Sequence, residues 1–379
     1  MKPDTQAIHA GYDIDPTTGA LAQPIHLSTT FERDLDGDFS RGYQYIRNAN
    51  PNRVELENRL ATLEGGTDCA MFASGSTAML SLFQALKTGD HIIAPENMYF
   101  GIQVILREIM TPWGLETTFV DMADVDAVRD AIRDETRMII TETPSNPMMT
   151  LTDIAEVAQI AKEKNIFFVV DNTVGTLLFQ QPFDLGADMV VHSTTKFISG
   201  HSDVLGGALI VKEQAESALW AQVLRIQEIG GAVPDPHSCW LTLRGIMTMP
   251  VRVRAMHTNA LKIATHLEQH PQVERVLHPA LPSHPQHDLF KKQMSGATGL
   301  FSFQVTGGAQ NAINFTNGLQ IIKRVTSFGG VRSKIEHRAS IEEGTSTPEN
   351  LLRISIGLED PDDLIADIEQ ALERVNVPV

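Results

Sequence analysis

The chain has 379 residues, of which 42% are hydrophobic, and 47 acidic against 30 basic side chains give a formal net charge of −17. This length and composition are typical of a globular protein with a sizeable core. The acidic balance argues against nucleic acid and anionic membrane surfaces as partners, because basic patches supply the affinity for both.

Signals for export or membrane insertion are also missing from the sequence. No apolar run approaches the ~18 residues of a membrane span, and the opening residues lack an apolar stretch like that of a secretory signal. Cys69 and Cys239 are too few for a disulfide framework, which fits a reducing compartment. We therefore expect a cytoplasmic enzyme that acts on a small molecule.

The first part of the chain predicts an arm followed by a mostly parallel sheet. Residues 1–50 are rich in Asp, Thr, Pro and Gly, so they are either disordered or packed as an arm on something else. A helix is expected over Arg53–Glu64, and short apolar runs then alternate with amphipathic stretches. The runs that predict buried strands are Ala70–Ala73, Ile92–Ala94, Thr118–Asp121, Met138–Thr141, Ile166–Asp171, Met189–His192 and Ala208–Val211. Such alternation predicts a sheet covered on both faces, with ligands beyond the carboxyl ends of its strands.

The second part predicts a smaller α+β domain. A long helix is expected from about His237 to beyond His266, with a kink or break at Pro250. Strands are expected at Leu300–Val305, Val325–Phe328 and Leu351–Ile356, before a closing acidic helix over Asp360–Val375. We therefore predict an α/β fold with an arm (1–50), a large domain (51–240) and a small domain (241–379).

Three segments carry residues suited to chemistry, and each also has an ordinary structural explanation. Ser74–Thr77 opens a predicted helix after a strand, where free N–H groups can bind phosphate, although Ser74 is also a plain helix cap. Asp171 ends a buried strand, where it is either a ligand carboxylate or a turn residue. Lys196 follows another strand, with Ser193 and Thr195 on one side of an extended segment. The alternative for Lys196 is a surface lysine.

The three segments together are more specific than each one alone. A phosphate cradle, a strand-end carboxylate and a lysine flanked by hydroxyl groups suit one cofactor in particular. Pyridoxal 5′-phosphate needs a phosphate site, a carboxylate on its ring nitrogen and a lysine for its Schiff base. No metal site is expected, because His266 and His270 lack the rest of a zinc-binding pattern.

At this point the sequence resembles the Cys/Met-metabolism pyridoxal-phosphate enzymes along nearly its whole length. This family includes cystathionine γ-synthase, cystathionine γ- and β-lyases, methionine γ-lyase and O-acetylhomoserine sulfhydrylase. The blocks that carry the resemblance are Ile8–Gly11, Asp15–Ala20, Pro24–Ile25, Thr29–Phe31, Tyr45–Pro51, Glu142–Pro147, Val170–Thr173, Ser193–Lys196, Gly200–Val204, Ser327–Gly330 and Arg353–Asp360. The resemblance implies a type I, aspartate-aminotransferase-like fold and a homo-oligomer, expected to be a tetramer built as a dimer of dimers.

The resemblance also implies a role for individual residues. Lys196 would form the Schiff base and move protons, Asp171 would pair with the ring nitrogen, and Tyr99 would stack on the ring and act as acid or base. Residues expected to hold the phosphate are Gly75, Ser76, Ser193 and Thr195, together with Tyr45 and Arg47 from the arm of a neighbouring subunit. Residues expected near the substrate are Arg353, as the carboxylate clamp, with Ser327, Glu342 and Asn146, the last also near the cofactor O3′.

Several positions depart from the family pattern, and they concern the substrate rather than the cofactor. Phe100 replaces a small Gly, Ile102 ends a stretch that is usually Gly-Thr, Thr326 precedes Ser327, and Arg332 replaces a common Glu. The segment that usually reads His-Pro-Ala-x-Met-Thr-His is His337-Arg338-Ala339-Ser340-Ile341-Glu342-Glu343 here.

Glu342 and Glu343 suggest a substrate with a cationic tail. We predict a γ-lyase for a γ-substituted L-amino acid, with canavanine as the sharpest guess, because paired carboxylates suit a guanidinium. The glutamates are as readily explained as solvated or neutralised by Arg332 and Arg338. Cystathionine or methionine γ-lyase, γ-replacement and cystathionine β-lyase remain alternatives, as does a cofactor-binding scaffold without catalysis. Retention of Lys196, Tyr99 and Arg353 counts against the scaffold.

Overall fold

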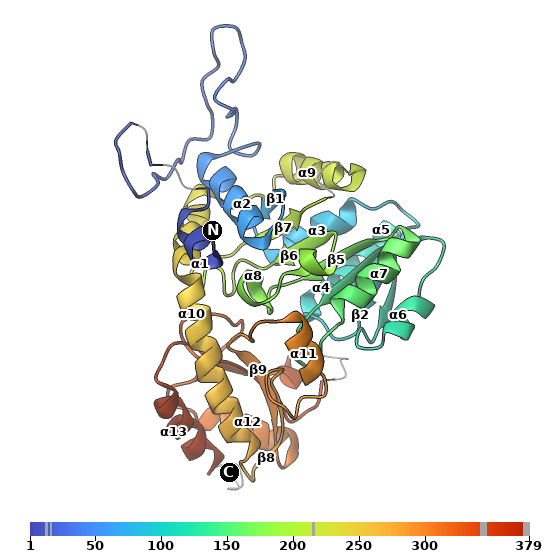
Figure 1. Cartoon of the computed structure of the whole chain (residues 1–379), viewed down its shortest axis with the longest axis vertical. Helices are drawn as coiled ribbons and strands as arrows, with labels where there is room; N and C mark the ends of the chain where they lie inside the picture. The colour runs from blue at the N-terminus through green and yellow to red at the C-terminus, as the bar shows by residue number, and fades with distance from the viewer. Residues whose placement is uncertain (12–13, 16, 214–216, 342–346, 374–379) are drawn as a thin grey trace.

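Two β-sheets organise the chain (Figure 1). The computed structural model describes residues 1–11, 14–15, 17–213, 217–341 and 347–373. The larger sheet has seven strands in the order β1-β7-β6-β5-β4-β2-β3. They are β1 (Asp68–Phe72), β2 (His91–Pro95), β3 (Glu116–Val120), β4 (Thr136–Glu142), β5 (Phe167–Asp171), β6 (Met189–His192) and β7 (Gly207–Val211). All seven lie where the apolar runs predicted strands.

The larger sheet is mostly parallel, as predicted. Strands β3, β2, β4, β5 and β6 run in one direction, whereas β7 is antiparallel to both of its neighbours, β1 and β6. The carboxyl ends of β4, β5 and β6 therefore meet at one edge. In the register of β4 and β5, Glu142 lies opposite Asp171.

Helices cover both faces of this sheet, as the nearly continuous apolar strands require. On one face, α3 (Gly75–Gln84) and α9 (Ala218–Gly230) bury Met79, Phe83 and Trp220 against the strands. The other face is covered by α2 (Pro51–Glu64), α7 (Ile154–Lys164) and α8 (Thr176–Phe179). Short helical segments complete the connections: α4 (Phe100–Val104), η1 (Ile105–Met110), α5 (Thr111–Trp113), α6 (Val125–Asp130) and η2 (Pro182–Leu185).

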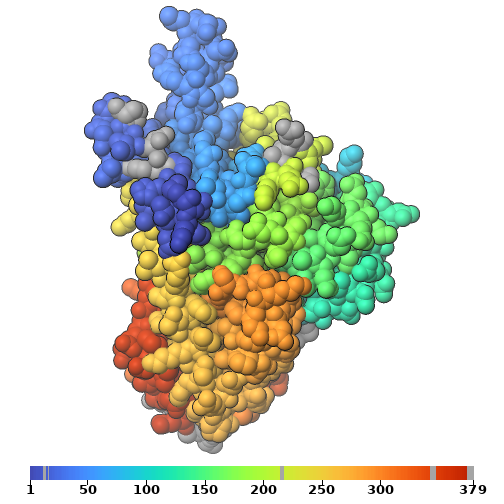
Figure 2. Space-filling view, viewed as in Figure 1, coloured from blue at the N-terminus to red at the C-terminus, as the bar shows by residue number. Residues whose placement is uncertain are grey.

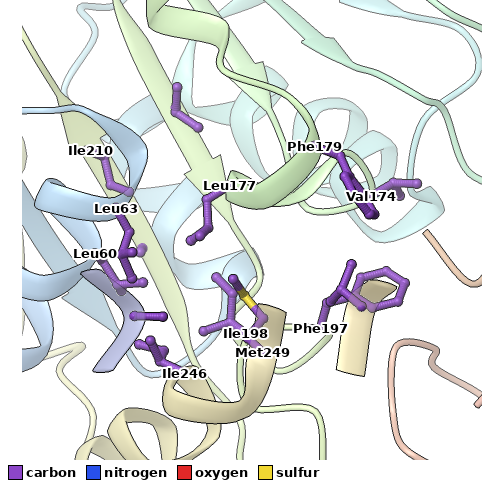
Figure 3. Close-up of a cluster of buried hydrophobic side chains, with 14 of the residues drawn as sticks. Leu60, Leu63, Val174, Leu177, Phe179, Phe197, Ile198, Ile210, Ile246 and Met249 are labelled. Atoms are coloured by element: carbon purple, nitrogen blue, oxygen red, sulfur yellow. The ribbon is translucent and has the colours of Figure 1, made fainter. Parts of the chain in front are cut away.

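One long helix, α10 (Pro236–Glu268), runs from the larger sheet to the second sheet (Figure 1). A kink or a break was predicted at Pro250; the helix continues through the proline, so the break is wrong, and the kink stays a prediction. Buried contacts on both sides of the proline hold the helix in place. Before it, Ile246 and Met249 pack in one cluster with Leu60 of α2 and Ile198 (Figure 3), and after it Val253 belongs to the same cluster. Among the described residues, no helix is both long and apolar enough to cross a membrane.

The second sheet has five strands in the order β10-β11-β12-β9-β8. They are β8 (Val273–Leu277), β9 (Leu300–Val305), β10 (Lys323–Arg324), β11 (Lys334–His337) and β12 (Leu351–Ser355), and the helices that accompany them are α11 (His287–Gln293), α12 (Gly308–Gly318), the short η3 (Arg338–Ser340) and α13 (Pro361–Leu372). The strand predicted at Val325–Phe328 is wrong. Strand β10 ends at Arg324, and Ser327 has a φ of 74°, which turns the chain away from extended geometry.

The N-terminal segment has a docked helix and a projecting part. Helix α1 (Pro3–His9) packs on α2 and α10 and buries Ala7. Residues 23–26 stay bonded to the body, since Trp240 Nε1 donates to Gln23 O (2.9 Å) and His26 N donates to Asn52 Oδ1 (2.9 Å). Much of the remaining chain extends away from the body (Figures 1 and 2) with local pairs, as where Phe31 N donates to Gln44 O. Leu21 and Leu27 are 73% and 70% exposed, so this part has no core of its own. The domain limits stay a prediction, and residues 240 and 241 fall inside α10.

Candidate active site

A cavity of about 120 Å³ lies at the carboxyl ends of β4, β5 and β6, beside the start of α3. Eight of the residues predicted to bind the cofactor or the substrate line it: Gly75, Ser76, Tyr99, Asn146, Asp171, Ser193, Thr195 and Lys196. Further lining residues are Glu142, Thr173, Leu205 and Phe328. The cavity thus gathers side chains from positions far apart in the sequence.

The start of α3 offers unpaired N–H groups to the cavity. Ser74 caps the helix by accepting a hydrogen bond from Thr77 N (3.0 Å), so its capping role is real. The first N–H groups of a helix have no partner within it, and here they belong to Gly75 and Ser76. A Cβ on Gly75 would lie 2.9 Å from Ser193 Cβ, so glycine is needed for this close approach. The arrangement suits an anion such as a phosphate.

The two hydroxyl groups beside Lys196 differ in their surroundings. Ser193 lines the cavity, and its backbone N donates to Thr173 Oγ1 (2.8 Å). The Thr195 hydroxyl donates to Gly206 O (3.2 Å) and accepts from Gly206 N (3.0 Å). Thr195 therefore also fixes the loop that returns toward β7, a role that the sequence did not indicate.

Asp171 combines the turn role with a place in the cavity wall. Its Oδ1 accepts a hydrogen bond from Thr173 N (2.9 Å). Burial raises the pKa of Asp171 above its usual value, and the Thr173 hydrogen bonds together with the charges of His192 and Lys196 oppose that rise. A carboxylate here can pair with a cationic nitrogen brought into the cavity.

Lys196 points its amino group toward the second sheet. Nζ donates to Ser327 Oγ (2.7 Å) and lies 4.8 Å from the centre of the Phe328 ring. Burial lowers the pKa of Lys196 to about 8, and the nearby charges of Arg353, Lys334 and Arg338 add to the effect while Glu336 opposes it. With that pKa about a tenth of the Lys196 amine is neutral, and nucleophilic, at pH 7, far more than for an ordinary lysine.

Glu142 ties two of the cavity residues together. Its Oε2 accepts from Tyr99 N (2.9 Å) and its Oε1 from Asn146 N (2.7 Å), at only 4% exposure. No role for Glu142 was predicted from the sequence, although it ends a strand just as Asp171 does. One carboxylate thus sets the distance between the loop that carries the Tyr99 ring and the loop that carries Asn146.

Arg353 and Ser327 lie just outside the residues that line the cavity, and each bonds to one that does. Arg353, on β12, donates from Nη1 to Asn146 Oδ1 (2.9 Å), and Ser327 binds Lys196. Arg353 Nη2 also donates to Glu336 Oε2 (2.6 Å), a partner that was not predicted from the sequence. Strand register brings these two together, because Glu336 lies opposite Arg353 in the β11–β12 pair.

A second buried network lies on the far face of the sheet from Asp171. His192 Nε2 lies 2.8 Å from Glu64 Oε2, and Asn172 Nδ2 donates to Glu64 Oε1 (2.8 Å). All three residues are at most 1% exposed. They hold the ends of β5 and β6 to α2 and so fix the strand ends that carry Asp171 and Ser193.

The structure does not bring every predicted residue to this cavity. Tyr45 and Arg47 are not among its lining residues; Arg47 Nη1 donates to Glu228 O (2.6 Å) on α9 instead. Arg332 is exposed. Glu342 lies outside the described residues, as does Glu343. Among the described residues, no three His, Cys, Asp or Glu side chains are arranged to hold a metal ion.

The cavity fits pyridoxal 5′-phosphate by the chemistry of its donor groups. The α3 N–H groups and Ser193 suit the phosphate, Asp171 suits the ring nitrogen, and the neutral amine of Lys196 suits the aldehyde. Residues 4–373 match the family described as Cys/Met metabolism PLP-dependent enzyme. The chain belongs to this family, whose cofactor is pyridoxal phosphate.

Relatives within the family carry out more than one reaction. The chain is 40% identical to cystathionine gamma-synthase from Mycobacterium leprae, over 97% of this chain and 96% of that protein. It is 38% identical to cystathionine beta-lyase from Coxiella burnetii, over 97% of each chain. The crystal structure of cystathionine gamma-lyase from Lactobacillus plantarum complexed with L-serine matches with a TM-score of 0.94 at 36% identity, over 99% of each chain. The protein is thus a pyridoxal-phosphate-dependent lyase or transferase, and the predicted fold class is confirmed.

The lowered pKa of Lys196 gives a first prediction. Because its pKa is about 8 rather than the usual ~10.4 of lysine, the amine deprotonates as pH rises through about 8. In cofactor-free protein, acetylation of Lys196 followed by mass spectrometry should therefore reach half its maximal rate near pH 8. A midpoint near that of the exposed lysines of the same chain would contradict the lowered pKa.

The bridging role of Glu142 gives a second prediction. In Glu142→Gln one acceptor oxygen becomes an NH₂ group, so either Tyr99 N or Asn146 N loses its partner. A hydrogen bond to a charged group contributes about 1.5–3 kcal/mol, so cofactor affinity should fall by about tenfold or more. Equilibrium dialysis measures the affinity, visible circular dichroism reports the ring environment, and the exposed Glu135→Gln is the control. Unchanged affinity and dichroism in Glu142→Gln would refute the bridge.

Proposed function

We propose that the protein is a γ-lyase, which eliminates the γ-substituent of an L-amino acid with pyridoxal phosphate as cofactor. The observation that carries the proposal is the amine of Lys196, held beside Asp171 and the start of α3 with a pKa of about 8. The γ-replacement reactions, cystathionine or methionine γ-lyase activity and cystathionine β-lyase activity would use the same residues and remain the alternatives.

The residues of the cavity would divide the binding of the cofactor among them. Gly75 and Ser76 would bind its phosphate through their N–H groups, with Ser193 and Thr195 supplying hydroxyls. Asp171 would hold the ring nitrogen in its protonated form, and Tyr99 would stack on the ring. The bound cofactor supplies an electron sink that acidifies the hydrogens on Cα and Cβ of an attached amino acid.

Two acid–base groups on one cavity support elimination at Cγ. This reaction removes protons at two carbons and protonates a leaving group, whereas elimination at Cβ removes only the proton on Cα. Lys196 would take the Cα proton with its amine, and Tyr99 or Lys196 would protonate the departing group. The ring of Tyr99 packs against Gly101, whose added Cβ would come within 2.7 Å of it, so the ring has a defined place.

Arg353 would bind the substrate α-carboxylate. Its guanidinium is 3% exposed and bonded to Asn146 at the cavity wall, and a planar guanidinium binds a carboxylate well. Asn146 and Ser327 would complete this end of the substrate site.

The first test of the function concerns Lys196. In Lys196→Ala the protein should keep its fold but lose nearly all turnover, because the variant has no amine to bond the cofactor or move the Cα proton. Release of 2-oxobutanoate, homoserine and the γ-substituent from a panel of γ-substituted amino acids measures the activity. An undiminished rate in Lys196→Ala would disprove this mechanism, and production of pyruvate alone by wild type would favour β-elimination.

We also propose a homo-oligomer, a tetramer built as a dimer of dimers, in which the arm of one subunit completes the site of another. The support is that residues 27–44 project from the body with Leu27 and Leu35 exposed, and that Tyr45 and Arg47 do not line their own cavity. The two free cysteines, Cys69 and Cys239, are buried thiols, which suits a reducing compartment such as the cytoplasm.

Subunit mixing tests the shared site. Lys196→Ala and Arg47→Ala should each be inactive alone, but a dimer with one of each has one site with both residues intact. After exchange of equal amounts, activity should return to about a quarter of wild type, since half the dimers are mixed and half their sites are restored. Exchange is confirmed with differently tagged subunits. No recovery despite proven exchange would assign Arg47 to the site of its own chain.

The finer proposal for the substrate is a cationic tail, with canavanine as the specific candidate. Its support is the sequence alone, since Glu342 and Glu343 lie outside the described residues. The chain that precedes them, η3, follows β11, whose Glu336 contacts Arg353, so the segment leaves from the neighbourhood of the clamp. Lys334 and Arg338 on the same stretch are cations, and they count against this proposal.

Substrate comparison tests the tail. Wild type should favour canavanine over cystathionine, methionine and O-acetylhomoserine by about tenfold or more in kcat/KM, since a shielded charge-assisted hydrogen bond contributes about 1.5–3 kcal/mol. Glu342→Gln should lower that preference, whereas the exposed control Glu349→Gln should not. A wild-type preference for a neutral thioether, or an unchanged ranking in Glu342→Gln, would exclude the cationic tail.

A further inference from the structure

Glu336 and two arginines form a buried charge cluster beside the cavity. Glu336 faces Arg353 across the β11–β12 pair, and Arg338 follows two residues later, just after β11 ends. A single carboxylate oxygen of Glu336, Oε2, accepts from Arg353 Nη2 (2.6 Å) and from Arg338 Nη1 (2.7 Å). The side chains of Arg353, Arg338 and Glu336 are 3%, 7% and 8% exposed.

The position of Glu336 opposes the binding of a substrate carboxylate at Arg353. A substrate carboxylate at Arg353 would be a second anion on a guanidinium that already pairs with Glu336. Two carboxylates on one buried cation repel each other, and little water reaches these side chains to screen that repulsion. Without another positive charge, the cluster and the bound carboxylate would together carry one excess negative charge.

We propose that Arg338 is a specificity-determining residue that lets Arg353 bind the substrate carboxylate, by neutralising Glu336. Taken by themselves, these three side chains sum to one positive charge, which a bound carboxylate would offset. Lys334 is a further cation; burial lowers its pKa, and Arg353 is close enough for its charge to add to that effect. Arg338 acts through Glu336 and is therefore a positioning residue. The inference rests on the proposed role of Arg353 as the carboxylate clamp.

A two-residue cycle tests this inference in the holoenzyme. Arg338→Met keeps the bulk of the side chain but removes the charge, and it should raise the substrate KM by about tenfold or more while kcat changes by less than about threefold. Glu336→Gln/Arg338→Met removes the competing carboxylate as well, so its KM should return to within about threefold of that of Glu336→Gln. A purely structural role for Arg338 predicts that the double variant is at least as impaired as Arg338→Met.

Ligand binding gives a readout that does not depend on turnover. L-Norvaline has the α-carboxylate but no γ leaving group, and n-butylamine has the amine without the carboxylate. Visible absorbance titrations of the holoenzyme should show about tenfold weaker L-norvaline binding in Arg338→Met, with n-butylamine binding unchanged. Equal weakening of both ligands, or of neither, would overturn the proposal.

Two further variants keep the test decisive. Arg338→Lys retains the charge and should bind L-norvaline nearly as wild type does, whereas Arg338→Gln should behave as Arg338→Met. This pair replaces Arg338→Met if that variant does not fold. Equal affinities of Arg338→Lys and Arg338→Gln for L-norvaline would overturn the proposal. Arg353→Gln tests the proposed carboxylate clamp separately from the role of Arg338. If it leaves the KM unchanged, the proposed clamp fails; if it raises the KM while Arg338→Met does not, only the role of Arg338 is wrong.

Discussion

The hydrogen bond from Lys196 to Ser327 joins the two sheets at the cavity, and it requires a rigid chain on both sides. On the Lys196 side, Arg252 of α10 donates to Phe197 O (3.0 Å) and Ile198 O (3.1 Å), which fixes the turn after the lysine. Gly200 closes that turn with a φ of 71°, and an added Cβ would collide with the Arg252 guanidinium. Partial burial lowers the pKa of the Lys196 amine only while the amine stays buried. The fixed backbone turn after Lys196 keeps the side chain from swinging back into solvent.

The acidic side chains around the cavity, Glu142, Glu64 and Asp171, hold neighbouring backbone and side-chain groups in place as well as supplying negative charge. Glu142 accepts hydrogen bonds from two backbone N–H groups and so positions their loops, whereas Glu64 contacts His192 and Asn172 and so ties the strand ends to α2. Asp171 receives a backbone hydrogen bond but keeps its place in the cavity wall. Asp171 is thus the carboxylate placed to meet a cationic nitrogen brought into the cavity.

The sequence predicted the parts of the site that follow from local pattern. Asp171 and Lys196 come after apolar strands, and Gly75 opens a helix, so parallel strands were enough to bring them together. Glu336 could not be found in this way, because its role depends on the register between β11 and β12, and β11 itself gave no clear apolar alternation. Ser327 was placed in a strand because its neighbours are apolar, whereas a left-handed backbone conformation turns its hydroxyl group to the lysine.

Glu336 raises the question of why an anion lies beside a site for carboxylates at all. Arg353 and Arg338 are too deeply buried to remain together without a counter-ion, and removing one partner from a buried ion pair costs several kcal/mol, about 3–5. The carboxylate of Glu336 balances the charge of the buried arginines before the substrate binds. It also holds the Arg353 guanidinium in one orientation against Asn146. Orientation fixed in advance reduces the ordering that binding must supply. The carboxylate of Glu336 also lowers the affinity of Arg353 for the substrate carboxylate. Arg338 offsets this effect, because it restores the positive charge that Glu336 neutralises.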